Sequence, residues 1–152
     1  MKTLVTGGAG FIGSHLVERL LDGGHEVIVV DNYHSAGPGN LEHLLKNPGL
    51  SVHRVDITNY QEIKPLFHGV GWTFHLAGRA DIVSSINDPI AYHRANVEGT
   101  VSVLEAARHV GVERFVYAAS STCYGLPDQV PTPESAPISP MYPYALTKYF
   151  GE

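Results

Sequence analysis

The sequence has few of the features that mark secreted, membrane-bound or nucleic-acid-binding proteins. It contains one cysteine, Cys123, which excludes an internal disulfide and fits the reducing environment of the cytoplasm. No apolar run has the length of a transmembrane helix or the character of a signal peptide, and the first expected strand begins near Lys2. Lysine and arginine are scattered and the formal net charge is −5. We therefore expect neither a membrane nor a nucleic acid as a partner.

The chain also lacks a metal-ligand motif, although it has nine histidines. No two of these histidines are closer than seven residues, and there is no His-x-x-x-His or Cys-x-x-Cys pair. We expect no metal site, and we interpret the histidines as separate surface, capping or core residues.

What the chain does contain is a regular alternation of β-branched runs and helical stretches. A chain of 152 residues is long enough for one domain with a sizeable core. The expected strands are Thr3–Thr6, Glu26–Asp31, Val52–Asp56, Trp72–Leu76 and Arg114–Ala119; the expected helices are Gly10–Leu21, Asn40–Leu45, Tyr60–Phe67 and Pro89–His109. This order predicts an α/β fold, a doubly wound parallel sheet covered by helices on both faces.

A glycine-rich motif lies between the first expected strand and the first expected helix. It reads Gly8-Ala9-Gly10-Phe11-Ile12-Gly13, the Gly-x-Gly-x-x-Gly pattern of dinucleotide-binding turns. The glycines allow a tight turn and close approach of a pyrophosphate, and the helix N-terminus offers free N–H groups. The ATPase type of phosphate loop is excluded because Gly13 is followed by Ser14 and His15, with no lysine.

Acidic residues follow the second and third expected strands. Asp31 comes eighteen residues after Gly13, where a carboxylate can accept hydrogen bonds from both hydroxyls of the adenosine ribose. It would repel a 2′-phosphate, and residues 32–37 include no lysine or arginine to compensate. This favours NAD over NADP, although Asp31 is also suited to capping a loop. Asp56 and Ile57 are placed to flank the adenine, with a plain turn aspartate as the alternative.

Tyr144 and Lys148 stand four residues apart, a spacing that puts both on one face of a helix. An ammonium group beside a phenol favours the phenolate, so the tyrosine becomes usable as a general base. Ser120, Ser121 and Thr122 follow the fifth expected strand, at the edge of an open α/β sheet where ligands bind. Between these groups, residues 127–143 hold six of the ten prolines and predict a long loop.

A second Tyr-x-x-x-Lys pair, Tyr60 and Lys64, is present elsewhere in the chain. It belongs to the helix after the third expected strand, on the adenosine side, and no hydroxyl cluster precedes it. We therefore assign the catalytic role to Tyr144 and Lys148.

Taken together, the motifs occur in the order of a known family. They are Thr6-Gly-Gly-Ala-Gly-Phe-Ile-Gly-Ser-His15, Asp31-Asn32, His75-Leu-Ala-Gly78, Asn96-Val-Glu-Gly-Thr100, Ser120-Ser-Thr-Cys-Tyr-Gly125 and Tyr144-x-x-x-Lys148. Over essentially its whole length the chain resembles the N-terminal part of an extended short-chain dehydrogenase/reductase, in the nucleotide-sugar epimerase/dehydratase branch. The resemblance implies a Rossmann fold and NAD as cofactor.

The resemblance also implies a role for each matching residue. The phosphate loop corresponds to Gly7, Gly10 and Gly13, with the pyrophosphate against the backbone of Phe11 and Ile12. Asp31 and Asn32 match the ribose site, Asp56 and Ile57 the adenine site, and Ala77 and Gly78 the segment lining the cofactor. Asn96 matches a helix residue that steadies the neighbouring strand and the cofactor pocket. Ser120 matches the catalytic hydroxyl, Tyr144 the base and Lys148 the ribose-binding lysine.

Two departures from the family pattern shape the expected function. Family dehydratases have acidic residues after the catalytic Ser/Thr, where this chain has Ser121 and Thr122. The pattern is closer to that of UDP-sugar 4-epimerases, which oxidise a sugar hydroxyl with NAD and return the hydride to the other face. Family members are also roughly twice as long, so we expect residues 1–152 to be an incomplete NAD-binding domain without the C-terminal substrate domain.

The expected parent is thus an NAD-dependent epimerase of a UDP-hexose at C4, cytoplasmic and homodimeric at full length. Two alternatives stay open. The chain alone is an inactive NAD-binding fragment, or the parent is a nucleotide-sugar dehydratase or reductase of the same superfamily.

Overall fold

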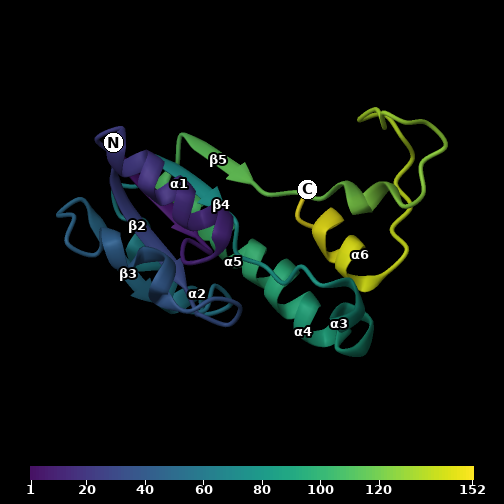
Figure 1. The fold of residues 1–152 in the computed structure, drawn as a ribbon, viewed down its shortest axis with the longest axis horizontal. Coiled ribbons are helices and arrows are strands. Elements are labelled where there is room, and N and C mark those ends of the chain that lie inside the picture. The colour runs from purple at the N-terminus through teal and green to yellow at the C-terminus, as the bar shows by residue number, and fades with distance from the viewer.

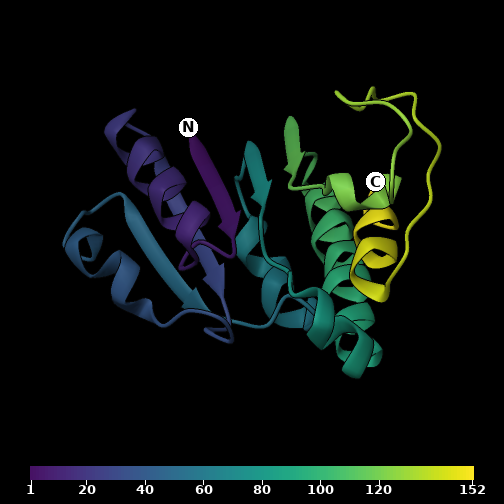
Figure 2. The same cartoon turned by 45° about the vertical axis from the view of Figure 1, so that its right-hand side comes forward.

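The computed structural model describes residues 1–152 and is built on one parallel sheet of five strands (Figures 1 and 2). The strands are β1 (Lys2–Thr6), β2 (Glu26–Asp31), β3 (Leu50–Arg54), β4 (Trp72–His75) and β5 (Arg114–Tyr117). Their order in the sheet is β3-β2-β1-β4-β5. The order reverses direction beside β1, so the carboxyl ends of β1 and β4 form the crevice where α/β folds bind ligands. The predicted doubly wound α/β fold is confirmed.

Helices cover both faces of the sheet because consecutive residues of β1 and β2 are apolar and point to opposite faces. On one face, Val5 and Val29 pack against α1 (Phe11–Asp22) and the 3₁₀ helix η1 (Pro38–Leu44). On the other face, Leu4 and Val30 pack against α2 (Tyr60–Ile63), η2 (Lys64–Phe67) and α5 (Gly99–Val110). Each face has its own hydrophobic cluster, and β1 and β2 contribute to both.

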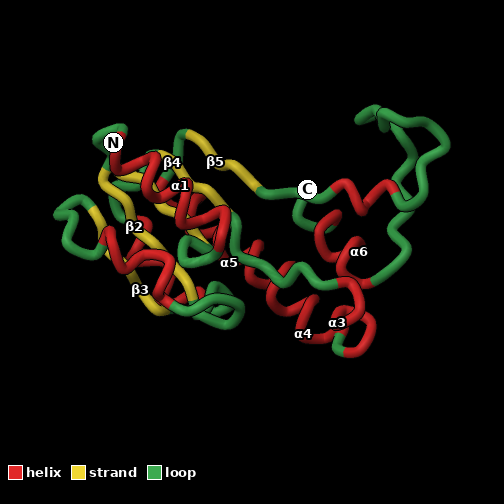
Figure 3. Tube along the Cα trace, in the orientation of Figure 1, coloured by secondary structure: helices red, strands yellow, loops and turns green.

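The remaining elements extend beyond β5 and α5 (Figure 3). They are α3 (Ile82–Asn87), α4 (Pro89–His93), the π-helical turn η3 (Arg94–Glu98), the 3₁₀ helix η4 (Ser121–Tyr124) and α6 (Pro143–Tyr149). The predicted long loop is present between η4 and α6, and it projects away from the sheet in Figure 1. None of the helices combines the length and apolar character that a membrane span requires.

Several predicted bounds are wrong. The third strand begins two residues before the predicted Val52, because Leu50 pairs with Val27. The predicted helix Pro89–His109 is three segments, since the π turn at Arg94–Glu98 interrupts the α-helical hydrogen bonding. The predicted helices Asn40–Leu45 and Tyr60–Phe67 are wholly or partly 3₁₀. This stretch has a cap at each end: Asp88 accepts from the N–H of Ala91, and Gly111 ends α5 at φ +71°.

Candidate cofactor and catalytic site

The glycine turn after β1 leaves no room for side chains. A Cβ on Gly13 would lie 2.1 Å from the carbonyl oxygen of Gly7, and one on Gly7 would lie 2.7 Å from the backbone N of Ala77. The first turn of α1 follows directly, with no capping side chain and no acidic residue. Its N–H groups therefore remain free for an anion. Phe11 and Ile12, which are 78% and 68% exposed, mark this open end.

A cavity of about 540 Å³ lies beside this turn, at the carboxyl ends of β2, β3 and β4. Eight of the predicted cofactor residues line it: Gly7, Gly10, Asp31, Asn32, Asp56, Ile57, Ala77 and Gly78. Phe11, Ile12, Gly13, Asn96, Tyr144 and Lys148 are not among its lining residues. A bare glycine turn, a carboxylate and this cavity together fit an extended dinucleotide.

Asp31 ties the glycine turn to the end of β2. One carboxylate oxygen accepts from the N–H of Ala9 at 3.0 Å, and the other accepts from the N–H of Tyr33 at 2.8 Å. Tyr33 needs this support because its φ of +61° is left-handed. A carboxylate has about four acceptor positions, so Asp31 can still accept from a ligand hydroxyl. The residue thus both caps the loop and faces the cavity.

Asn32 and Asp56 join the loops that follow β2 and β3. The Asn32 amide donates to one oxygen of Asp56 at 2.8 Å, and the other oxygen accepts from the N–H and hydroxyl of Thr58. Partial burial opposes ionisation of Asp56, but the hydrogen bonds from Thr58 and Asn32 outweigh it and lower its pKa. Arg94 acts in the same direction. The Asp56 carboxylate, which lines the cavity, is therefore ionised at neutral pH.

Arg79 reaches across the mouth of the cavity, which sequence reasoning missed. Its guanidinium lies 2.5 Å from Nε2 of His34, 3.8 Å from a carboxylate oxygen of Asp88 and over the ring of Tyr92. Residues 32–37 contain no lysine or arginine, whereas the fold brings Arg79 to the cavity from the loop after β4. The position of Arg79 directly after Ala77-Gly78 was the available signal.

Asn96 sits in the π turn and connects three segments. Its side-chain oxygen accepts from the N–H of Arg79 at 2.8 Å, and its amide donates to the Arg79 carbonyl and to Thr147 Oγ1, each at 3.0 Å. Gly78 lies beside it, where a Cβ would come within 3.0 Å of Asn96 Oδ1. The π turn widens the helix at Asn96, so its side chain reaches both the loop after β4 and helix α6.

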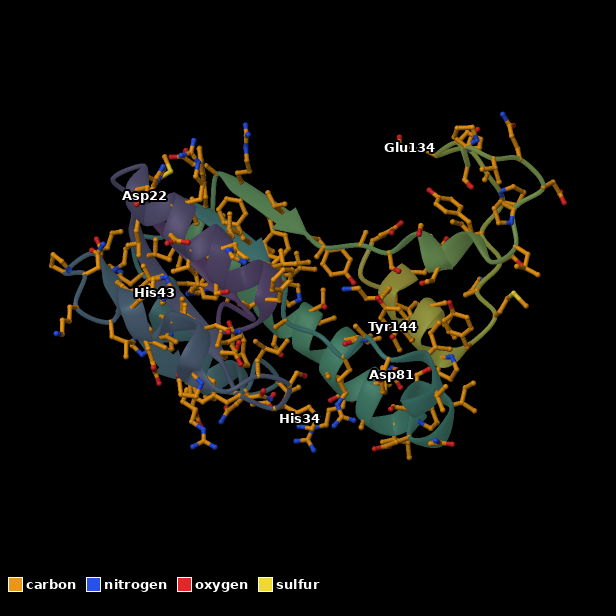
Figure 4. All side chains as sticks on the ribbon, viewed as in Figure 1. Asp22, His34, His43, Asp81, Glu134 and Tyr144 are labelled. Atoms are coloured by element: carbon orange, nitrogen blue, oxygen red, sulfur yellow. The ribbon has the colours of Figure 1, made fainter.

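Ser120 and Tyr144 come together although 24 residues separate them. The Tyr144 hydroxyl lies 3.5 Å from Ser120 Oγ, and Ser120 Oγ lies 2.8 Å from Thr122 Oγ1. The Tyr144 ring meets the edge of Tyr92 at a centroid distance of 6.4 Å. Figure 4 shows Tyr144 on α6 beside the start of α3 at Asp81, and Glu134 far out on the long loop.

Lys148 is 7% exposed and lies one helical turn after Tyr144. Its Nζ lies 4.5 Å from the centroid of the Tyr117 ring, and no hydrogen bond joins it to the Tyr144 hydroxyl. Burial lowers the pKa of Lys148 to about 8, although Glu152 acts against this shift. Lys148 is therefore still mostly protonated at pH 7, but its pKa lies only about one unit higher.

His75 is fully buried at the end of β4. Nδ1 lies 2.6 Å from Thr6 Oγ1 and Nε2 lies 2.9 Å from Thr100 Oγ1, so the imidazole connects β1 and α5. Burial lowers the pKa of His75 to about 3, and Lys148 acts in the same direction. The ring is thus a neutral core residue, one of the roles expected for histidines. No group of three His, Cys, Asp or Glu side chains is arranged to hold a metal ion.

The alternative pair Tyr60 and Lys64 lies on α2 and η2, with the ammonium 5.8 Å from the ring centroid. Tyr60 packs against the hydrophobic cluster that contains Leu4 and Val30.

The chain is similar in sequence to proteins of known function. Residues 4–152 match the family model described as GDP-mannose 4,6 dehydratase. The chain is 39% identical over 158 residues to UDP-glucose 4-epimerase 2 of Arabidopsis thaliana, covering 99% of this chain and 45% of that protein. The chain therefore spans about half the length of the curated relatives it matches.

Solved structures show the same architecture. A dTDP-glucose 4,6-dehydratase from Streptomyces venezuelae, with NAD and TYD bound, has a TM-score of 0.93 and 36% identity, covering 99% of this chain and 49% of that one. A UDP-glucose 4-epimerase from Bifidobacterium longum, in complex with NAD⁺ and UDP, has a TM-score of 0.91 and 31% identity, covering 99% and 47%.

Proposed function

The chain belongs to the GDP-mannose 4,6-dehydratase family of extended short-chain dehydrogenases/reductases, and from this premise we propose that it forms the NAD-binding and catalytic part of a nucleotide-sugar 4-epimerase. The substrate class is a UDP-hexose. One observation carries the proposal: Tyr144, Ser120 and Thr122 bring three hydroxyl groups together at the ligand edge of the sheet, with no carboxylate among them.

The residues divide the work between binding and proton transfer. The glycine turn and the first turn of α1 hold the pyrophosphate, Asp31 and Asn32 the adenosine ribose, and Asp56 and Ile57 the adenine. Bound NAD would supply the hydride acceptor. Tyr144 takes the proton from the sugar C4 hydroxyl, and Ser120 hydrogen-bonds the same oxygen. Lys148 holds a positive charge beside them and anchors the second ribose, while Asn96 keeps α6 against the loop after β4.

A dehydratase is the second candidate, favoured by the family description and by the Streptomyces venezuelae neighbour. Elimination at a neighbouring sugar carbon needs a group that transfers a proton there, and family dehydratases use acidic residues. Here Thr122 occupies such a position, and its hydroxyl is bonded to Ser120 at 2.8 Å. A hydroxyl in this place favours epimerisation. The homodimer and the cytoplasmic location remain predictions.

The test combines cofactor binding with product analysis. We expect the 152-residue chain to bind NAD in a calorimetric titration and to show no turnover alone, because the residues that choose the sugar lie in the part of the relatives that it does not match. A protein that includes that part should interconvert UDP-glucose and its C4 epimer, as followed by NMR. A new methyl signal from a 4-keto-6-deoxy sugar would establish the dehydratase instead. Absence of NAD binding would overturn both.

A further inference from the structure

We propose that Tyr117 is the positioning residue of Lys148: its ring holds the ammonium group, and its hydroxyl holds the helix backbone that carries the lysine. The inference rests on the proposed function, in which Lys148 is the catalytic lysine. Tyr117 itself lies at the end of β5 and lines no part of the cofactor cavity.

Two contacts from one side chain define the arrangement. The Lys148 Nζ lies 4.5 Å from the centre of the Tyr117 ring, within the range of a cation–π interaction. The Tyr117 hydroxyl donates to the Lys148 backbone carbonyl at 3.2 Å. The carbonyl belongs to the last turn of α6 and also accepts from the N–H of Gly151 at 3.1 Å, so the Tyr117 hydroxyl is its second donor. Both ends of the lysine are thus held by the neighbouring strand.

The glycine after the helix leaves space for this ring. A Cβ on Gly151 would lie 2.3 Å from the Tyr117 hydroxyl and 2.9 Å from a ring carbon. On its other side the Tyr117 ring stacks near His75, with centroids 5.7 Å apart and planes tilted by 31°. Strand β4, strand β5 and the chain after α6 therefore fix the ring from three directions.

The ring matters because no hydrogen bond or ion pair with the protein holds the ammonium. Lys148 Nζ forms neither a hydrogen bond nor an ion pair, although the residue is buried. The titratable groups facing it are His75 on β4, Tyr117 on β5, Tyr144 on its own helix and Glu152 after that helix. Neutral His75 offers no negative charge, and Glu152 is exposed. The ring face is then the direct contact that favours the charged lysine, and Glu152 adds to it through its charge.

The phenol of Tyr117 keeps its proton throughout the range in which Lys148 titrates. Burial raises the pKa of Tyr117 to about 12, with Glu152 and Tyr144 acting in the same direction. The hydroxyl can therefore donate to the Lys148 carbonyl whether the lysine is charged or neutral.

The experiment is a titration of Lys148 by NMR in the chain labelled with ¹³C and ¹⁵N at lysine. The Lys148 signal is assigned by its absence in Lys148→Met. In the unchanged protein we expect its Cε protons to be shifted upfield by the ring current of Tyr117, a result that needs no further variant. Tyr117→Phe should leave the titration midpoint in place, because the ring remains. Tyr117→Leu should lower the midpoint by roughly one pH unit, a tenfold change in the protonation equilibrium.

Phe115→Leu is the matched control. Phe115 lies two residues earlier on the same strand, is half-buried and also stacks near His75, at 6.0 Å. It should leave the Lys148 midpoint unchanged. A missing ring-current shift, or equal midpoints in Tyr117→Leu and the unchanged protein, would overturn the proposal. If Tyr117→Leu fails to fold, Tyr117→Met and the ring-current measurement decide. None of these readings requires NAD or a sugar, so they stand apart from the tests of the proposed function.

Discussion

The region before β5 and the region after it are held together in different ways. The buried members of both hydrophobic clusters lie between Leu4 and Ala107, where α1, α2 and α5 press on the sheet. Beyond β5, the buried residues are Cys123, Ala145, Thr147 and Lys148, and none of these four belongs to either cluster. The segment that carries Ser120 and Tyr144 therefore has little apolar core of its own.

Polar side chains replace the core in this second region. The Asn96 amide holds Thr147, the Tyr117 hydroxyl holds the end of α6, and the Tyr144 hydroxyl meets Ser120. In the first region the cofactor turn is formed mainly by backbone, with side-chain hydrogen bonds from Asp31 and Asn40, and it lies on a sheet that two apolar clusters cover. The difference indicates that the catalytic half depends more on single hydrogen bonds than the cofactor half does.

The largest effect should follow from Tyr144→Phe in a protein that turns over. The phenyl ring keeps the contact with Tyr92 and removes only the acid–base group. We expect the rate of hydride transfer to fall by about 10²–10⁴-fold while NAD remains bound. Reduction of bound cofactor, followed by absorbance after addition of a UDP-sugar, measures this directly.

Tyr60→Phe is the matched control, because Tyr60 belongs to the other Tyr-x-x-x-Lys pair. It should leave the rate nearly unchanged. Equal losses in the two variants would show that the choice between the pairs is wrong.

Gly13→Ala tests the backbone-built region. The added Cβ would lie 2.1 Å from the Gly7 carbonyl and 2.7 Å from the Gly8 Cα, and neither atom is part of a flexible side chain. Overpacking of this severity should lower the free energy of unfolding by about 3 kcal/mol or abolish folding. Gly39→Ala, where an added Cβ meets nothing within 4 Å, should change it by less than about 0.5 kcal/mol. Urea denaturation distinguishes them, and similar stability of the two variants would contradict the account of the turn.

The features of the region before β5 were largely predictable from the sequence. The glycine turn, Asp31 and the second strand lie in short contiguous motifs, and strand β2 was predicted to the residue. Parallel pairing then brings the ends of β2, β3 and β4 together without any further information, which is why eight predicted cofactor residues line one cavity.

Side-chain contacts between distant segments were not predictable in the same way. Arg79 and His34 are 45 residues apart, and Tyr117 and Lys148 are 31 apart. These contacts depend on how α6 is oriented and on the π turn. The π turn interrupts a stretch that has the periodicity and caps of one continuous helix. The local sequence pattern predicts a helix here, but it does not predict the extra residue in the π turn. The direction in which the Asn96 side chain points could therefore not be predicted.

Acidification should weaken the region around β4. The folded-state pKa of His75 is about 3, below its ordinary value of 6.5, so the unfolded chain binds the proton first as pH falls. Stability is then fully present above about pH 6.5 and declines below it, by about 2 kcal/mol between pH 8 and pH 5 from this group alone. His75→Gln, which removes the charge change, should flatten that part of the profile in urea titrations at each pH. An equally steep decline in the variant would assign the acid sensitivity to other groups.

The smallest expected effect concerns cofactor choice at Asp31, and it bears on how far a local motif decides function. The carboxylate faces the cavity, so a ribose 2′-phosphate would meet an uncompensated negative charge at this wall, and NAD should bind more tightly than NADP. Arg79 comes from the opposite side but already contacts His34 and lies near Asp88. Asp31→Asn keeps the size of the side chain and one acceptor for the loop, and it removes the charge. We expect Asp31→Asn to lower the ratio of NAD affinity to NADP affinity by about tenfold, equivalent to about 1.4 kcal/mol, in competition titrations with the two cofactors. Equal or tighter binding of NADP by the unchanged protein would mean that Arg79 turns toward the ribose, and that a side chain brought by the fold overrides the carboxylate at the end of β2.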